Sequence, residues 1–188
     1  MTATKLTFKD KVAVARDFDR FCDECVYHFD KRTRRRSLLK RYGCQTEVSD
    51  LLVKGEWFVC LKPRQIGITT ILAVFCAWCL VTKPNFQILV MQQNRDYAKD
   101  FLQRVRYIHR WLPKWLQIPI TADSRFEVSF DHGPGQHSSL RVVAGDKGSG
   151  RSTTPDLIIF DEHAYITLAK EARQGCEPTL EHSGGQIV

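Results

Sequence analysis

The sequence predicts an α/β fold in which a central, mainly parallel β-sheet is flanked by helices. Two short apolar runs, residues 58–61 and 157–160, each end in polar residues, as buried strands of parallel sheets do. Between them, apolar residues recur at three- and four-residue spacing over residues 98–111, which predicts an amphipathic helix. Strands that alternate with helices form parallel sheets with right-handed crossovers. At 188 residues and 43% hydrophobic, the chain can hold one sizeable domain.

The first run opens the stretch FVCLKPRQIGITTILA, residues 58–73, which predicts a strand, a tight polar turn and a helix. A helix start reached by such a turn offers unpaired N–H groups and the positive end of the helix dipole to a phosphate chain. Compared with the GxxxxGK[ST] loop, Gly67 and Thr69 are in place, but Ile68 stands where lysine is usual and Lys62 where the first glycine is usual. Ile68 cannot neutralise phosphate, so the cation must come from Lys62, Arg64 or both. Alone, this string is equally compatible with a strand–turn–helix that binds no ligand.

The second run, DLIIFDE at residues 156–162, ends in two adjacent carboxylates. Four apolar residues predict a strand buried on both faces that delivers these acids to the carboxyl edge of the sheet. Asp161 is expected to share the Mg²⁺ shell with the hydroxyl of Thr69, and Glu162 is expected to polarise the attacking water. The two motifs together predict a P-loop NTPase of the ASCE type.

These motifs resemble those of a known family. KPRQIGITT resembles the variant Walker A of viral large terminase subunits, the motors that pump DNA into empty capsids, and LIIFDE resembles their Walker B with its catalytic glutamate. The segment GSGRSTTPDLIIFDE resembles the one that supplies the family's arginine finger, which assigns that role to Arg151. The resemblance runs from about Tyr42 to the C-terminus and implies that Gln45 or Tyr42 contacts adenine. The alternative is that Gln45 simply lies near a helix N-cap.

The expected site therefore binds ATP and Mg²⁺. Glu162 and Arg151 are the expected catalytic residues, and Thr69 and Asp161 are the expected metal ligands. The residues expected to contact the nucleotide are Lys62, Arg64, Gln65, Ile66, Gly67, Ile68, Thr69, Thr70 and Gln45.

Two regions are expected along the chain: a helical and basic extension over residues 1–41, and the ATPase domain over residues 42–188. Apolar spacing predicts one helix across residues 8–29. Residues 31–41 carry seven basic side chains and no acid, within a chain of net charge +7. Such a run fits attraction to a polyanion, or alternatively a solvated helix face or a flexible linker.

The remaining elements follow in order. A helix is expected from about Thr46 to near Gly55, a strand over residues 86–91 and a long helix from Asn94. Residues 111–120 are expected to form a loop or a short helical turn, and residues 125–130 and 139–143 two strands of a β insertion. A helix of about eight to ten residues is expected after Glu162, and GGQIV is expected to open a further strand.

The sequence and the resemblance together predict the ATPase motor domain of a phage large terminase, which drives double-stranded DNA into a procapsid. The resemblance implies DNA, the portal protein and the small terminase subunit as partners, and a self-associated, pentameric ring. The protein is expected in the host cytoplasm and transiently at the portal vertex, with no membrane contact. The chain stops before the coupling motif and nuclease domain of the resembled family, so no nuclease activity is expected. The alternatives are another P-loop DNA translocase or helicase, and a nucleotide-binding module without turnover.

Overall fold

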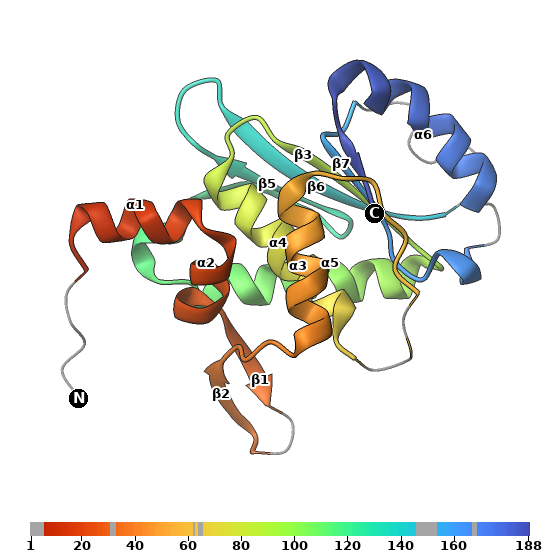
Figure 1. Ribbon diagram of the computed structural model, residues 1–188. Helices are drawn as coiled ribbons and strands as arrows, with labels where there is room; N and C mark the ends of the chain where they lie inside the picture. The colour runs from red at the N-terminus through yellow and green to blue at the C-terminus, as the bar shows by residue number, and fades with distance from the viewer. Residues whose placement is uncertain (1–5, 31–32, 62, 64–65, 146–153, 167–168) are drawn as a thin grey trace.

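The fold is built on a six-stranded sheet, with the strand order β4-β5-β6-β3-β7-β8. The computed structural model describes residues 6–30, 33–61, 63, 66–145, 154–166 and 169–188 (Figure 1). The strands of this sheet are β3 (Gln87–Gln92), β4 (Ile120–Asp123), β5 (Glu127–Asp131), β6 (His137–Ala144), β7 (Leu157–Phe160) and β8 (Gln186–Ile187). β6, β3, β7 and β8 pair in parallel, and β4 and β5 extend one edge antiparallel. The predicted α/β class with a mainly parallel sheet is confirmed.

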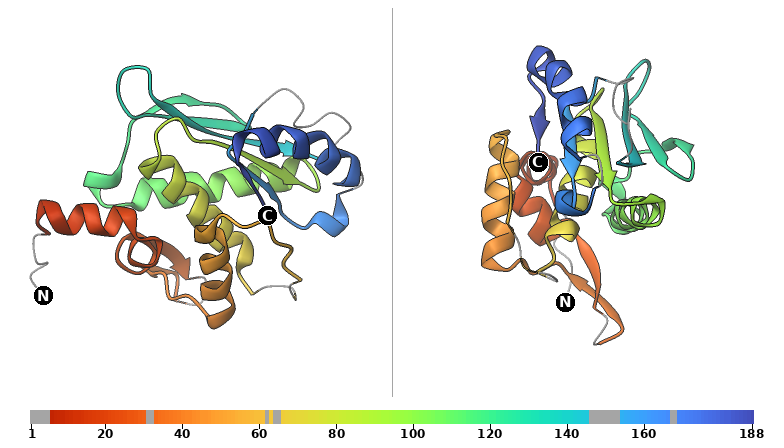
Figure 2. Two further views of the ribbon diagram at one scale, coloured as in Figure 1. Left: turned by 45° about the horizontal axis from the view of Figure 1, so that its top comes forward. Right: turned by 90° about the vertical axis from the view of Figure 1, so that its right-hand side faces the viewer.

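Helices cover both faces of the sheet (Figure 2). α4 (Ile68–Thr82) and α5 (Arg95–Trp111) pack on one face, in a core that includes Ile88 and Val90 of β3. α6 (Ala169–Ser183) packs on the other face, against Leu89 and Met91 of the same strand. Successive side chains of a strand point to opposite faces, so one apolar strand serves two cores. α6 is longer than the eight to ten residues predicted.

The amino-terminal segment forms two helices, so the prediction of one helix is wrong. Asp17 separates α1 (Phe8–Arg16) from α2 (Phe18–Cys25). Its carboxylate accepts a hydrogen bond from the Arg20 N–H and so caps α2. The Phe18 ring lies 5.3 Å from the Phe75 ring and 5.2 Å from the Trp78 ring of α4. The extension therefore shares the core of the main domain, and the boundary predicted at residue 42 stays a prediction.

The described part of the basic run, residues 33–41, does not form a helix face. β1 (Tyr27–Asp30) pairs antiparallel with β2 (Arg35–Leu38) in a separate two-stranded sheet. This hairpin projects from the body of the molecule (Figures 1 and 2). Residues 31 and 32 at its turn lie outside the described residues.

The segment that leads into the P-loop differs most from expectation. α3 (Gly43–Lys54) closes at Gly55, which confirms the predicted end, although it starts three residues before Thr46. Residues 58–61 do not form the predicted strand, because within the described part of the chain a single backbone hydrogen bond ties them to the sheet, from the Phe58 N–H to the Ile187 carbonyl at 3.4 Å. The Trp57 indole N–H, 2.9 Å from the Gly185 carbonyl, also holds the segment beside β8.

The two strands predicted as a β insertion belong to the main sheet. β6 lies next to β3 and pairs with it in parallel over six residues, while β5 and β4 continue outward from it. Lys114–Leu116 form a 3-10 helix within residues 111–120, which confirms the predicted short helical turn, and β4 begins at Ile120, the last residue of that stretch. No helix within the described part of the chain is both long enough and apolar enough to cross a bilayer.

Candidate nucleotide-binding site

The start of α4 depends on a glycine. Gly67 is the N-cap, with a left-handed backbone at φ +77°, and its carbonyl accepts hydrogen bonds from the N–H groups of Thr70 at 3.0 Å and Ile71 at 3.2 Å. A Cβ at this position would lie 2.4 Å from Nε2 of Gln45. Both the conformation and the close approach exclude a larger residue without rearrangement. The turn therefore fixes the start of α4, where Thr69 lies within hydrogen-bond distance of Asp161, the residue that follows β7.

Gln45 supports this turn from α3. Its Oε1 accepts from the Tyr42 N–H at 3.0 Å, and its Nε2 donates to the Ile66 carbonyl at 2.9 Å. The side chain is only 4% exposed. The interpretation of Gln45 as a residue at a helix N-cap is thus confirmed, since its side chain accepts from the N–H of the N-cap residue Tyr42. Its predicted contact with adenine stays a prediction.

The Ile68 side chain is buried in the core. It is 4% exposed and belongs to the core between α4 and the sheet. The residue can therefore contribute only its backbone to phosphate binding. Lys62, Arg64, Gln65 and Arg151 lie outside the described residues, so their roles as phosphate ligands and as arginine finger stay predictions.

The structure brings together the two residues predicted to hold Mg²⁺. The hydroxyl of Thr69 donates to Oδ1 of Asp161 at 3.2 Å, although the residues are 92 positions apart in the chain. Asp161 follows β7 directly and is 4% exposed, and its N–H donates to the Met91 carbonyl at 3.2 Å. Parallel strand pairing therefore carries this carboxylate to the start of α4, as the sequence predicts.

A third residue completes this group and was missed in the sequence. Gln92, at the end of β3, donates from Nε2 to Oδ2 of Asp161 at 3.2 Å and is 4% exposed. Its carbonyl also accepts from the Gly145 N–H at 2.9 Å. The available signal was a polar residue at the carboxyl end of a buried strand, which becomes informative only once β3 is known to neighbour β7.

Glu162 differs from Asp161 in both exposure and backbone. It is solvent-exposed and has a left-handed backbone, φ +60° and ψ +43°, which is uncommon for a residue other than glycine. Its carbonyl accepts from the Tyr165 N–H at 2.8 Å, which fixes the turn after β7. Such strained backbones concentrate at functional sites. The two adjacent acids thus separate into one buried carboxylate and one carboxylate in contact with solvent.

The donor set at this edge suits a hard cation. Among the described residues, no group of three or more His, Cys, Asp or Glu side chains could enclose a metal. The Thr69 hydroxyl and the Asp161 carboxylate supply oxygen, the donor that Mg²⁺ prefers, and Mg²⁺ usually takes its other ligands from phosphates and water. The residues present therefore fit Mg²⁺ that arrives with a nucleotide.

A cavity of about 560 Å³ lies beside the first turns of α4. Tyr42, Gln45 and Thr70 line it near the P-loop, and residues of β1 and α5, including His28 and Tyr107, line it further away. Cavities of this volume take small-molecule ligands. Aromatic and polar side chains surround it, which suits the planar base and sugar of a nucleoside.

A protein-family model matches this chain across both motifs. The family model described as "Terminase large subunit, T4likevirus-type, N-terminal" matches residues 59–174, from the segment before the P-loop to the middle of α6. This match includes Thr69, Asp161 and Glu162 and covers well over half of the chain.

Three solved structures share the fold. The ATPase domain of the Thermus phage P74-26 large terminase, in an arginine-to-alanine mutant, has a TM-score of 0.63 at 23% identity, over 79% of this chain and 64% of that one. The same domain without the mutation has a TM-score of 0.52 at 24% identity, over 66% and 55%. A large terminase from a thermophilic bacteriophage has a TM-score of 0.61 at 10% identity, over 79% of this chain and 38% of that one. The chain thus spans less than two thirds of each of these structures. Together with the family model, which matches most of the chain, the comparisons show that it belongs to the T4likevirus-type terminase large subunit family, in the N-terminal part of that subunit.

Proposed function

We propose that this domain binds ATP with Mg²⁺ and hydrolyses it. The observation that carries the proposal is the hydrogen bond between Thr69 and Asp161, with an exposed glutamate directly after the buried aspartate. This is the arrangement that phosphoryl-transfer sites of the P-loop class require: a hydroxyl and a carboxylate for the metal, and a second acid for water. The match to a terminase family model over both motifs supports it.

Each residue has a distinct part in the proposed reaction. The N–H groups that follow Gly67 bind the phosphate oxygens, with Lys62 and Arg64 supplying the positive charge that Ile68 cannot. Thr69 and Asp161 hold the metal, which when bound neutralises charge on the phosphates. A hydroxyl that donates to a carboxylate keeps lone pairs for a cation, so the observed bond need not break.

Two further residues act on the attacking water and on the charge that develops on the phosphates. Glu162 orients the attacking water and accepts its proton, because its carboxylate is exposed beside the buried Asp161. Arg151 of a neighbouring subunit stabilises the charge that develops on the phosphates. The cavity lined by Tyr42 and Gln45 takes the adenine and ribose.

We further propose that hydrolysis drives double-stranded DNA into a procapsid. This role would place the protein in the host cytoplasm and at the portal vertex, with the portal protein and the small terminase subunit as partners and a pentameric ring as the working assembly. Membership of the terminase large subunit family supports these proposals. They concern a longer subunit, of which this chain spans a part.

Hydrolysis of ATP by the purified chain, measured across Mg²⁺ and protein concentration, tests the proposed chemistry. Glu162→Gln is expected to lower turnover by about 10² to 10⁴ while ATP binding persists, because the substitution removes only the proton acceptor. Asp161→Asn is expected to raise the Mg²⁺ concentration needed for ATP binding. Glu47→Gln, an exposed acid on α3, is the matched control and should leave both unchanged.

Two results would count against the proposal. ATP binding without turnover at any protein concentration would identify a nucleotide-binding module. Turnover that is unaffected by Glu162→Gln would show that another group activates the water. Turnover that rises more than linearly with protein concentration would support an arginine supplied by a neighbour.

A further inference from the structure

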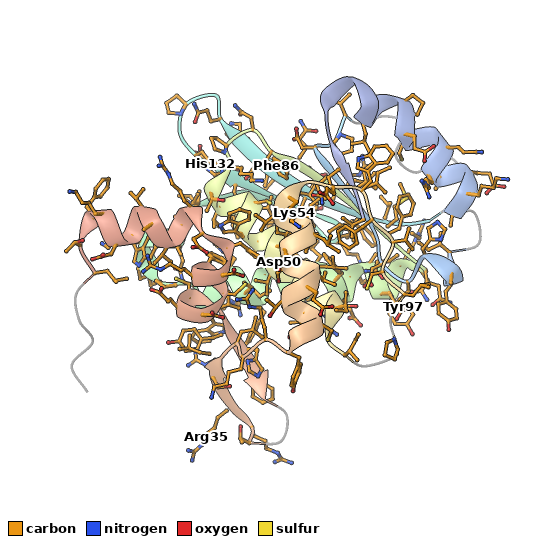
Figure 3. The ribbon with its side chains drawn as sticks, in the orientation of Figure 1. Arg35, Asp50, Lys54, Phe86, Tyr97 and His132 are labelled. Carbon is orange, nitrogen blue, oxygen red and sulfur yellow. The ribbon has the colours of Figure 1, made fainter. Side chains whose placement is uncertain are left out.

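The β1–β2 hairpin presents an unusual concentration of positive charge. All four residues of β2, Arg35 to Leu38, are exposed, and Arg34 before them has a left-handed backbone at φ +51°. The hairpin stands away from the main sheet, and the labelled Arg35 side chain points outward from it (Figure 3). The β1–β2 hairpin therefore carries three consecutive arginines, Arg34 to Arg36.

One of these arginines fixes the arm to the body. The Arg36 guanidinium carbon lies 3.3 Å from the centre of the Trp111 ring, at the end of α5. A cation this close to an indole face is held by electrostatic and stacking attraction. With Arg34, Arg35, Phe29 and Tyr107, these residues line an open cleft of about 500 Å³, which we call the arginine cleft.

The charge of the arginine cleft is available to a partner. None of the ion pairs between described residues involves Arg34, Arg35 or Arg36. Arg41, which belongs to the same basic run, is different: its side chain is 7% exposed and pairs with Asp19 and Asp23 of α2. Within the described part of the run, Arg41 is therefore a structural cation, whereas Arg34, Arg35 and Arg36 are exposed.

We propose that the arginine cleft is a docking surface for the phosphate backbone of duplex DNA. The planar guanidinium group bonds phosphate through two N–H groups at once, and duplex DNA carries about one negative charge per 1.7 Å of its axis. We take the duplex as the occupant because Arg36 already covers one face of the Trp111 ring, which reduces the aromatic surface on which the bases of an unpaired strand would stack. The inference rests on the proposed function only in taking DNA as the partner, and it concerns a surface distinct from the hydrolytic residues.

Fluorescence anisotropy with a labelled duplex of about 30 base pairs, without ATP, tests this surface. Arg34→Glu combined with Arg35→Glu is expected to weaken binding at least tenfold. The slope of log K against log salt is negative, and its magnitude should decrease by about 1.8, because two phosphate contacts are lost and each contributes about 0.9. Lys9→Glu combined with Arg16→Glu is the control, because both residues are exposed on α1 and the net charge changes equally. This control should weaken binding less than threefold.

The outcomes separate this inference from the proposed function. Equal weakening in both charge-reversed pairs would mean a general charge effect and would overturn the inference, as would tighter binding of a single-stranded oligonucleotide that depends on Arg34 and Arg35. Arg34→Gln with Arg35→Gln should reproduce the loss more weakly, and thermal melting should confirm that each variant is folded. Glu162→Gln should keep full DNA affinity, and the arginine pair should keep its ATP turnover in the absence of DNA.

Discussion

Replacing Gly67 by alanine should destabilise the P-loop in a way that the structure quantifies. A left-handed backbone costs an L-residue roughly 1–2 kcal/mol. The new Cβ would also lie 2.4 Å from Nε2 of Gln45, which is buried and held by two hydrogen bonds, so Gln45 must move and lose its bond to Ile66. Loss of that bond adds about 1 kcal/mol. The free energy of unfolding should therefore fall by roughly 2–3 kcal/mol.

Gly55→Ala is a matched control for the backbone term. Gly55 has nearly the same conformation, φ +74°, but nothing lies within 4 Å of the Cβ that alanine would add. Urea unfolding followed by tryptophan fluorescence should show a loss about 1 kcal/mol larger for Gly67→Ala than for Gly55→Ala. In a Gln45→Ala background, where the clash is absent, the difference should disappear. Equal losses for the two glycines in the wild-type background would refute the reasoning.

Three other perturbations probe the site and the core. Gln92→Met removes the N–H that holds the Walker B carboxylate, so the Mg²⁺ concentration for half-maximal ATP binding should rise roughly tenfold, while exposed Gln93→Met should change little. Burial lowers the pKa of His109, so the folded state keeps this group neutral and the free energy of unfolding should fall as pH drops below about 6.5; urea titrations at pH 7.5 and 5.5 should show a smaller difference in His109→Gln. A thiol reagent at pH 8 should modify exposed Cys44 and Cys60 quickly and the other five cysteines only on unfolding, because burial raises the pKa of several of them, to about 12 for Cys22, Cys25 and Cys79.

The parts of the site that sequence predicts are those that depend on strand direction. Asp161 follows the apolar run of β7, whose carboxyl end lies at one edge of the parallel sheet, and a hydrogen bond joins it to Thr69, although the run before Thr69 is not a strand. Gln92 could not be assigned in the same way, because its role depends on which strands are neighbours. Strand order is a tertiary property that apolar runs do not encode.

The wrong secondary-structure predictions fall where helical and strand spacing overlap, or where strand pairing rather than composition determines the structure. Phe18 and Phe21 continue the helical spacing of α1, so the break at Asp17 is hidden in an apparently continuous pattern. In β1, the alternation of Tyr27 and Phe29 is too short to outweigh that spacing. Residues 58–61 have the composition of a strand, but a strand also requires neighbours for its backbone, and among the described residues their link to β8 is one long bond.

Gln92 also connects the end of β6 to the residue that follows β7. Its carbonyl holds Gly145, the last described residue before positions 146–153, and its side chain holds Asp161. A displacement of Gly145 would therefore act on Asp161, the proposed metal ligand, through the single residue Gln92. Thermodynamic linkage would make such an influence mutual: whatever free energy the position of Gly145 contributes to metal affinity, metal binding would contribute equally to the position of Gly145. Occupancy of the proposed metal site and the position of Gly145 would then be two measures of one equilibrium.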